Sequence, residues 1–174
     1  ISRYRGLIEE AENYYKKALA LRESLDPGSP DVASIYSGLG DVAWYRGDLD
    51  AAETWFQKAL AILEAKAPGT LLLTTAYNNL GAVALDRGKA DEAEEWHKKA
   101  MVIREARAPN SPDLASTYNN LGAVADFRND LAAAEVWHKK AVAIQEAVAP
   151  NSIELASSYD SLGKEAHYKG DLAG

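Results

Sequence analysis

A Leu-Gly pair recurs four times along the 174-residue chain at a constant interval of 41 residues. A period of this length is typical of stacked supersecondary units, none of which can bury its apolar face alone. The repeat therefore predicts a scaffold in which each unit packs only on its neighbours. The pairs are Leu39-Gly40, Leu80-Gly81, Leu121-Gly122 and Leu162-Gly163.

Each period contains the pattern of two helices. In the unit that starts at Pro68, apolar spacing predicts a first helix over 71–86 and a second over 91–106. Gly88 lies where the first helix should end, because glycine accepts the left-handed backbone that follows many helix C-termini. Alanines at recurring positions allow close helix approach, and we interpret the recurring Trp and Tyr as packing residues. The positions equivalent to Gly88 hold Gly47, Asn129 and Gly170.

The repeat also predicts the domain organisation, a single all-α array of about eight helices arranged in antiparallel pairs. We expect an incomplete unit over 1–26, units over 27–67, 68–108 and 109–149, and an incomplete unit over 150–174. Because Arg5-Gly6 aligns with Arg46-Gly47, a second helix is expected to begin near Leu7. Polar capping helices are not evident at either end, which suggests a piece of a longer array with apolar end faces.

Composition and charge exclude several partners. The net charge of −7 argues against nucleic acid, since binding a phosphate backbone requires a basic surface. No apolar run approaches a membrane span, and the first residues lack a signal-peptide pattern, so no membrane partner is expected. The lack of cysteine removes thiolate sites and fits an intracellular, cytoplasmic protein.

Catalytic signatures are also missing from the sequence. His97 and His138 occupy equivalent positions on successive second helices, and no histidine–carboxylate ligand set at i,i+3 or i,i+4 spacing surrounds either of them on the inner wall. No nucleophile-elbow serine and no glycine-rich phosphate loop occurs. We therefore predict no enzyme activity, no cofactor and no metal.

The recurring residues resemble the tetratricopeptide repeat (TPR) family, whose unit is a helix-turn-helix of about 34 residues. The longer unit here, with Tyr77-Asn78-Asn79-Leu80 and the ending Ala59-Leu60-Ala61-Ile62-Leu63-Glu64, is similar to the long-helix variety of kinesin light chains. The resemblance implies a right-handed alpha-solenoid with first helices lining a concave groove that binds extended peptides. The residues that match the family pattern are Tyr77, Leu80-Gly81, Ala84, Ala93, His97, Ala100 and, displaced, Pro109.

Carried onto this sequence, the groove implies two kinds of binding residue. Asparagine is unfavourable inside helices but carries both donors and an acceptor for a peptide main chain. The recurring candidates are Asn78, Asn119, Asn79 and Asn120. As alternatives, the asparagines hydrogen-bond between neighbouring helices or persist as copies of an ancestral unit.

Aromatic and charged residues that break the repeat are the other candidates, because packing does not require different residues at equivalent positions. These are Asp41, Trp44, Tyr45, Asp126, Phe127, Lys164, His167 and Tyr168.

The sequence therefore predicts a protein–protein interaction scaffold. Its partner would be a protein or peptide segment with apolar or aromatic anchors and basic flanks. Two alternatives stay open: a self-assembly element that stacks head to tail through uncapped end helices, and a regulatory sensor arm of a larger multidomain protein.

Overall fold

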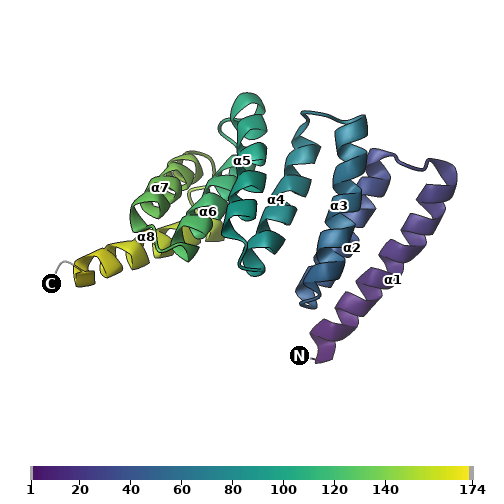
Figure 1. The fold of residues 1–174 in the computed structure, drawn as a ribbon, viewed down its shortest axis with the longest axis horizontal. Coiled ribbons are helices and arrows are strands. Elements are labelled where there is room, and N and C mark those ends of the chain that lie inside the picture. The colour runs from purple at the N-terminus through teal and green to yellow at the C-terminus, as the bar shows by residue number, and fades with distance from the viewer. Residues whose placement is uncertain (1, 173–174) are drawn as a thin grey trace. The chain divides into compact units, whose positions relative to one another are not determined.

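Residues 2–172, the part of the chain that the computed structural model describes, form eight α-helices (Figure 1). Side chains are described for residues 6–170. The described residues contain no strand, which confirms the all-α prediction. The helices are α1 (Ser2–Leu25), α2 (Pro30–Tyr45), α3 (Leu49–Lys66), α4 (Leu71–Asp86), α5 (Ala90–Arg107), α6 (Pro112–Phe127), α7 (Leu131–Val148) and α8 (Ile153–Leu172).

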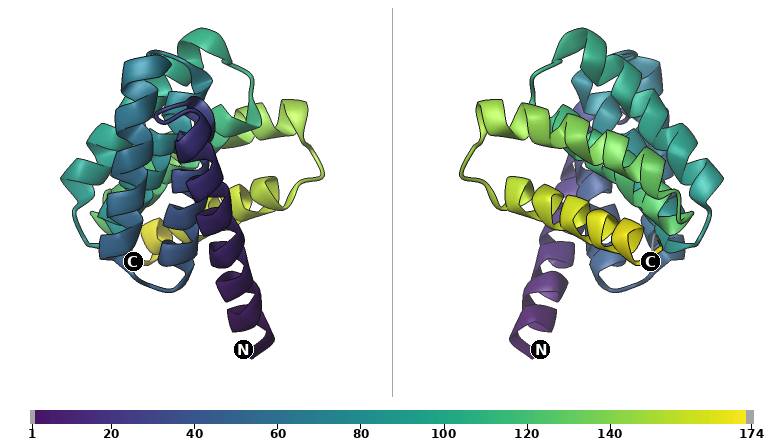
Figure 2. Two further views of the ribbon diagram at one scale, coloured as in Figure 1. Left: turned by 90° about the vertical axis from the view of Figure 1, so that its right-hand side faces the viewer. Right: turned by 90° about the vertical axis from the view of Figure 1, so that its left-hand side faces the viewer.

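The chain divides into two compact units, which we call unit 1 (Ile1–Arg87, with α1–α4) and unit 2 (Gly88–Gly174, with α5–α8). Within each unit, every helix packs against the next one along the chain. Consecutive helices run in opposite directions, as Figure 1 and Figure 2 show. Each unit is therefore a series of antiparallel helix hairpins, in agreement with the two helices predicted for each period.

A residue with left-handed backbone conformation follows each of the first helices α2, α4 and α6, as predicted. The φ angles of Gly47, Gly88 and Asn129 are 79°, 76° and 58°, and Asn129 is the one residue other than glycine with positive φ in the described chain. Asparagine tolerates this conformation better than other side chains. Asp48 and Asp130 then accept hydrogen bonds from the backbone N–H groups of Ala51 and Ala133, which starts the following helix.

The same prediction is wrong at Gly6 and Gly170. Helix α1 runs through Gly6 without a break, and α8 continues through Gly170 to Leu172. Glycine permits both the helical and the left-handed conformation. The left-handed turn forms at Gly47, where the next helix packs back on the previous one, whereas Gly6 and Gly170 lie within continuous helices.

The glycine of the Leu-Gly pair lies against a ring from the following helix. A Cβ atom on Gly40 would be 2.4 Å from the Phe56 ring, and one on Gly122 would be 2.5 Å from the His138 ring. Phe56 and His138 occupy equivalent positions and are buried. The predicted role of this glycine, to let the second helix come close, is thus confirmed for α2–α3 and α6–α7.

The recurring tryptophans pack less deeply than these rings. Trp55 is half-buried and stacks on Tyr36 with ring centroids 5.6 Å apart, and Trp137 stacks on Tyr118 at 5.8 Å. A lysine ammonium lies 4.4 Å from the centroid of each indole and is also close to the stacked tyrosine ring. The tryptophans therefore pack between helices as expected, but the neighbouring residue in each second helix fills the deeper position.

Two sets of polar contacts repeat with the sequence. The tyrosine of each first helix donates a hydrogen bond to a glutamate 13 residues earlier, for example from Tyr118 to Glu105 at 2.8 Å. The basic residue at the end of each first helix pairs with a glutamate 34 residues earlier. The second set comprises Arg46–Glu12, Arg87–Glu53, Arg128–Glu94 and Lys169–Glu135. The recurring Glu of the Ala-Glu pair thus links adjacent first and second helices.

We expect Gly122→Ala to destabilise the protein by about 1–3 kcal/mol, because the added methyl group overlaps the His138 ring. The matched control is Gly163→Ala at the equivalent position of α8, where no described atom lies within 4 Å of the added Cβ. This control should be neutral or stabilising by up to about 1 kcal/mol, since alanine favours helix. Urea unfolding measures both changes, and equal effects of the two substitutions would contradict the close-packing argument.

Candidate functional site

The predicted binding residues lie in both units. Unit 1 contains Asp41, Trp44 and Tyr45 at the end of α2 and the pair Asn78-Asn79 in α4. Unit 2 contains the others, namely Asn119, Asn120, Asp126, Phe127, Lys164, His167 and Tyr168. Each unit also has a cavity lined by some of these residues.

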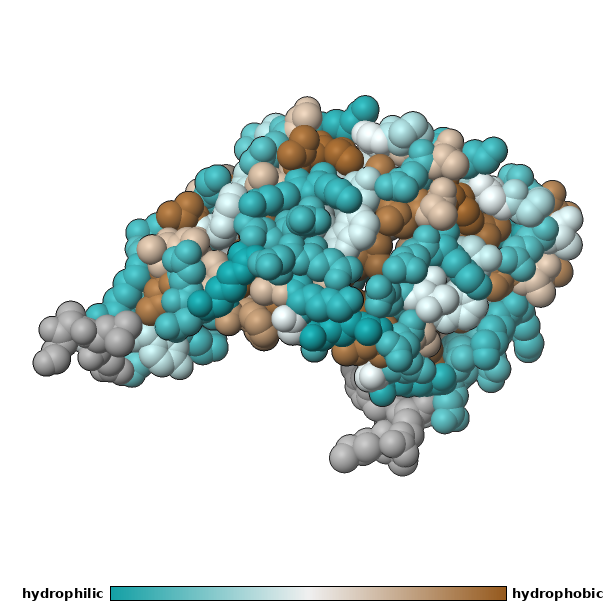
Figure 3. Space-filling model, viewed as in Figure 1, coloured by the Kyte–Doolittle hydropathy of each residue, from teal (hydrophilic) through white to brown (hydrophobic). Residues whose placement is uncertain are grey.

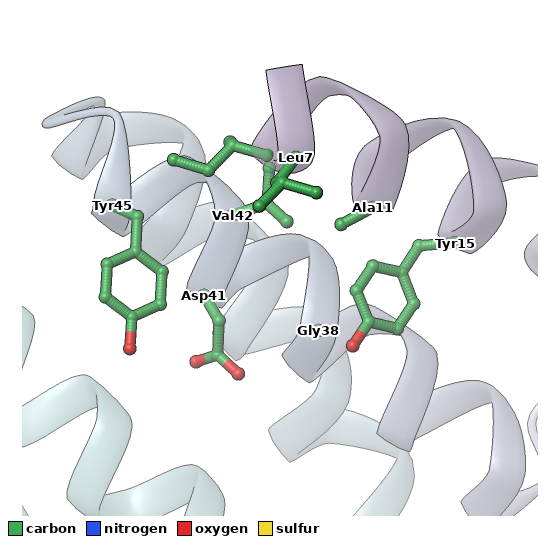
Figure 4. A pocket seen from close by; sticks show the side chains of 8 residues that line it. Leu7, Ala11, Tyr15, Gly38, Asp41, Val42 and Tyr45 are labelled. Carbon is green, nitrogen blue, oxygen red and sulfur yellow. The ribbon is translucent and has the colours of Figure 1, made fainter. Parts of the chain in front are cut away.

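The unit 1 cavity lies between α1 and α2 and has a volume of about 390 Å³. Asp41 and Tyr45 contribute to its wall, and Figure 4 shows the Asp41 carboxylate between the rings of Tyr45 and Tyr15. The Tyr15 ring packs against Gly38, where a Cβ would be 2.4 Å from it, at a position where the other repeats have Asn79, Asn120 and Ser161. The full lining is Leu7, Ile8, Ala11, Tyr15, Gly38, Asp41, Val42 and Tyr45.

Asp41 carries a charge in a mostly apolar wall. Burial raises the pKa of its carboxyl above the usual range. Among the described side chains, no cation pairs with it. A carboxylate in this position is stabilised when a cation approaches through the open side of the cavity.

Trp44 and Tyr45 form an aromatic pair beside this cavity. Their rings stack with centroids 6.4 Å apart. The Trp44 indole N–H donates a hydrogen bond of 2.6 Å to Asp86 of α4. Trp44 is thereby held in place, while the Tyr45 side chain is 76% exposed and available for contact.

Asn119 is engaged by helices on two sides. Its Oδ1 lies 3.1 Å from Nδ1 of His138 in α7, and its Nδ2 donates to Ser158 Oγ in α8 at 2.8 Å. These contacts correspond to the interhelical alternative for the asparagines. Asn78, Asn79 and Asn120 are half-buried. Their contact with a peptide stays a prediction.

The unit 2 cavity, of about 300 Å³, brings Asp126, Lys164 and Tyr168 together. Phe127 and Tyr168 are mostly exposed. His167 and Tyr168 are neighbours with ring centroids 6.2 Å apart. Lys164 pairs with Asp160 at 2.6 Å. The cavity lining thus combines the charged groups of Asp126 and Lys164 with the Tyr168 ring.

Several residues at these cavities were not predicted from the sequence. Leu7 and Tyr15 lie on α1, which is a second helix, whereas only first-helix residues were considered. Glu165 is buried beside the unit 2 cavity. A comparison of the repeats could have found it, because Val83 and Val124 occupy the equivalent positions.

His97, which is equivalent to Phe56 and His138, is also buried. Burial, with a smaller contribution from the positive charge of Arg104, lowers its pKa to about 4. Arg104 itself is buried and donates hydrogen bonds to the Asp113 carbonyl at 2.6 Å and to Thr117 Oγ1 at 2.7 Å. His97 is therefore a neutral packing residue near neutral pH.

We expect the His97 site to lose stability as the pH falls. The unfolded chain binds a proton at His97 near pH 6.5 and the folded chain only near pH 4. The stabilisation is thus complete above about pH 6.5 and is lost between pH 6.5 and 4, by roughly 3 kcal/mol in total. Urea unfolding across this range should give a smaller pH dependence for His97→Gln and His97→Phe than for the unchanged protein. Parallel curves for all three proteins would contradict the assignment.

These features define the class of protein. Antiparallel helix pairs that recur with a 41-residue period are typical of helical-repeat proteins. The tetratricopeptide repeat family model matches residues 1–65 and 72–147, and the chain belongs to this family. Tetratricopeptide repeats generally serve as protein–protein interaction scaffolds.

Solved structures of similar fold support the assignment. BtubC (BKLC) from P. vanneervenii is 26% identical with a TM-score of 0.86, and the match covers 98% of this chain and 70% of that one. A putative kinesin light chain of Podosopora anserina with nearly identical TPR-like repeats is 16% identical with a TM-score of 0.75, covering 97% and 82%. A point variant of that protein is 17% identical with a TM-score of 0.76, covering 97% and 81%. The likeness to these last two shows the fold alone.

The search of curated proteins finds no match. None of the helices among the described residues has the length and hydropathy needed to cross a membrane.

Proposed function

We propose that this chain is an interaction module that binds an extended segment of another protein through first-helix residues of each unit. The proposal rests on the α1–α2 cavity, which has an apolar wall and the exposed Tyr45 at its edge. The wall also contains the Asp41 carboxylate, which pairs with no cation among the described side chains. Tyrosine at the edge of an apolar cavity is a common anchor in protein interfaces.

The chemistry of this cavity specifies the partner segment. Its apolar wall suits an aliphatic or aromatic side chain, and Asp41 suits a Lys or Arg placed beside it. The net charge of −7 favours approach of a basic segment. In Figure 3, apolar side chains form separate patches among hydrophilic ones, which suits a chain with several spaced anchors.

We expect peptides selected from a random display library to contain Lys or Arg next to an aromatic or aliphatic residue. Their affinity, measured by fluorescence anisotropy, should fall about tenfold or more in Tyr45→Ala and in Asp41→Asn. The matched controls are Tyr14→Ala, an exposed tyrosine outside the cavity, and Asp31→Asn, an exposed acid paired with Arg22. Selection of acidic peptides, or equal losses in the control variants, would contradict the proposal.

A second candidate is self-association through α1. This helix carries Leu7, Leu21 and Leu25 with exposed fractions of 57%, 66% and 77%, which is unusual for leucine on one helix. Sedimentation velocity should then show a size that rises with protein concentration and that falls to the monomer in Leu21→Glu. A monomer at all concentrations would rule out this candidate and leave the peptide-binding proposal intact.

A further inference from the structure

Three potential metal ligands from three helices meet in unit 2. Asp126 lies at the end of α6, His138 in α7 and Glu165 in α8. Nε2 of His138 lies 3.3 Å from Oδ2 of Asp126 and 3.5 Å from Oε1 of Glu165. The ligand atoms of all three residues lie within 4.8 Å of one another. Any positive species bound between them would contact all three.

The hydrogen bonds of His138 favour a ligand role. Because Asn119 Nδ2 donates to Ser158 Oγ, its Oδ1 faces the ring and accepts from Nδ1–H of His138. Nε2 then faces the two carboxylates. In the neutral ring with its hydrogen on Nδ1, Nε2 carries a lone pair, and its 3.3 Å contact with Asp126 Oδ2 then requires a proton or a metal ion between the two atoms. A metal-bound histidine characteristically donates its other N–H to an oxygen acceptor in this way.

The buried carboxylate of Glu165 is a second feature that points to a bound cation. Its side chain is 3% exposed, and neither carboxylate oxygen accepts a hydrogen bond in the described structure. The nearby lysines are paired with other acids: Lys164 with Asp160, and Lys139 and Lys169 with Glu135. The buried carboxylate therefore lacks a partner that would offset its desolvation.

Packing does not require acidic residues at these positions. One period earlier, the residues equivalent to Asp126, His138 and Glu165 are Leu85, His97 and Val124, and two periods earlier they are Trp44, Phe56 and Val83. Each carboxylate thus stands where the two preceding repeats have an apolar residue. The equivalent histidine one period earlier, His97, occurs without acids at the other two positions. Packing alone therefore accounts for a histidine here but not for the two carboxylates.

We propose that Asp126, His138 and Glu165 bind one Zn²⁺ ion in unit 2. Zinc accepts imidazole and carboxylate ligands at about 2.0–2.2 Å in tetrahedral geometry, which places neighbouring ligand atoms roughly 3.3–3.5 Å apart. The distances of 3.3 and 3.5 Å from His138 Nε2 fit this geometry. The fourth position faces the unit 2 cavity, to which Asp126 and Glu165 both contribute, and takes a water molecule or a partner side chain. Asn119 orients the histidine.

The test is zinc binding by the untagged protein after EDTA treatment. Equilibrium dialysis with metal analysis should give one Zn²⁺ per chain, and Zn²⁺ should raise the unfolding temperature. Affinity should fall at least tenfold in Glu165→Gln and Glu165→Val, while Glu154→Gln, an exposed acid on the same helix, should bind zinc unchanged. Co²⁺ should give the visible absorption of a tetrahedral site in the unchanged protein and not in Glu165→Gln.

Glu165→Val has a further expected result that a structural role for the carboxylate would not give. Valine is the residue of the two preceding repeats, so the metal-free variant should unfold at a higher temperature than the metal-free parent and should not respond to Zn²⁺. Absence of saturable zinc binding overturns the proposal, and so does zinc binding of equal affinity and stoichiometry in both Glu165 variants. Glu165→Gln, which preserves the shape of the side chain, keeps the test valid if Glu165→Val does not fold.

Discussion

Contact between a ring and a glycine backbone sets the spacing of the helices in a pair. At Gly40 and Gly122, the rings of Phe56 and His138 occupy the place where a Cβ would lie. A side chain at either glycine would push the second helix outward, and the buried alanines around it would lose their contacts. The Gly40 contact thus fixes α2 against α3, and the Gly122 contact fixes α6 against α7.

Recurring contacts hold each helix to the next and leave other positions free to vary. The Tyr–Glu hydrogen bonds and the basic–Glu pairs recur with the 41-residue period, so they account for much of the repeat in the sequence. Buried polar pairs vary together: Leu63 and Ala76 are apolar, while the equivalent residues Arg104 and Thr117, and then Gln145 and Ser158, hydrogen-bond to each other. Asp41 and Glu165 lack such compensation among the described side chains, and our two proposals rest on them.

Much of the fold could be predicted from local patterns. The helix predicted over 71–86 is α4, and the one predicted over 91–106 is α5 with one more residue at each end. The left-handed residue at Asn129 was predicted because few side chains accept that conformation. The error at Gly6 and Gly170 has a physical cause, since glycine permits a helix end and packing of the next helix decides whether one forms.

The sequence by itself determined the period, the helices and the family, because helix periodicity and helix ends depend on residues close together in the chain. The tertiary structure decided which side chains meet. It enclosed Asp41 with residues of α1, directed Asn119 toward His138 and Ser158, and brought Asp126, His138 and Glu165 together from three helices. Such meetings depend on the rotation and spacing of packed helices and on side-chain rotamers, which a local sequence pattern does not specify.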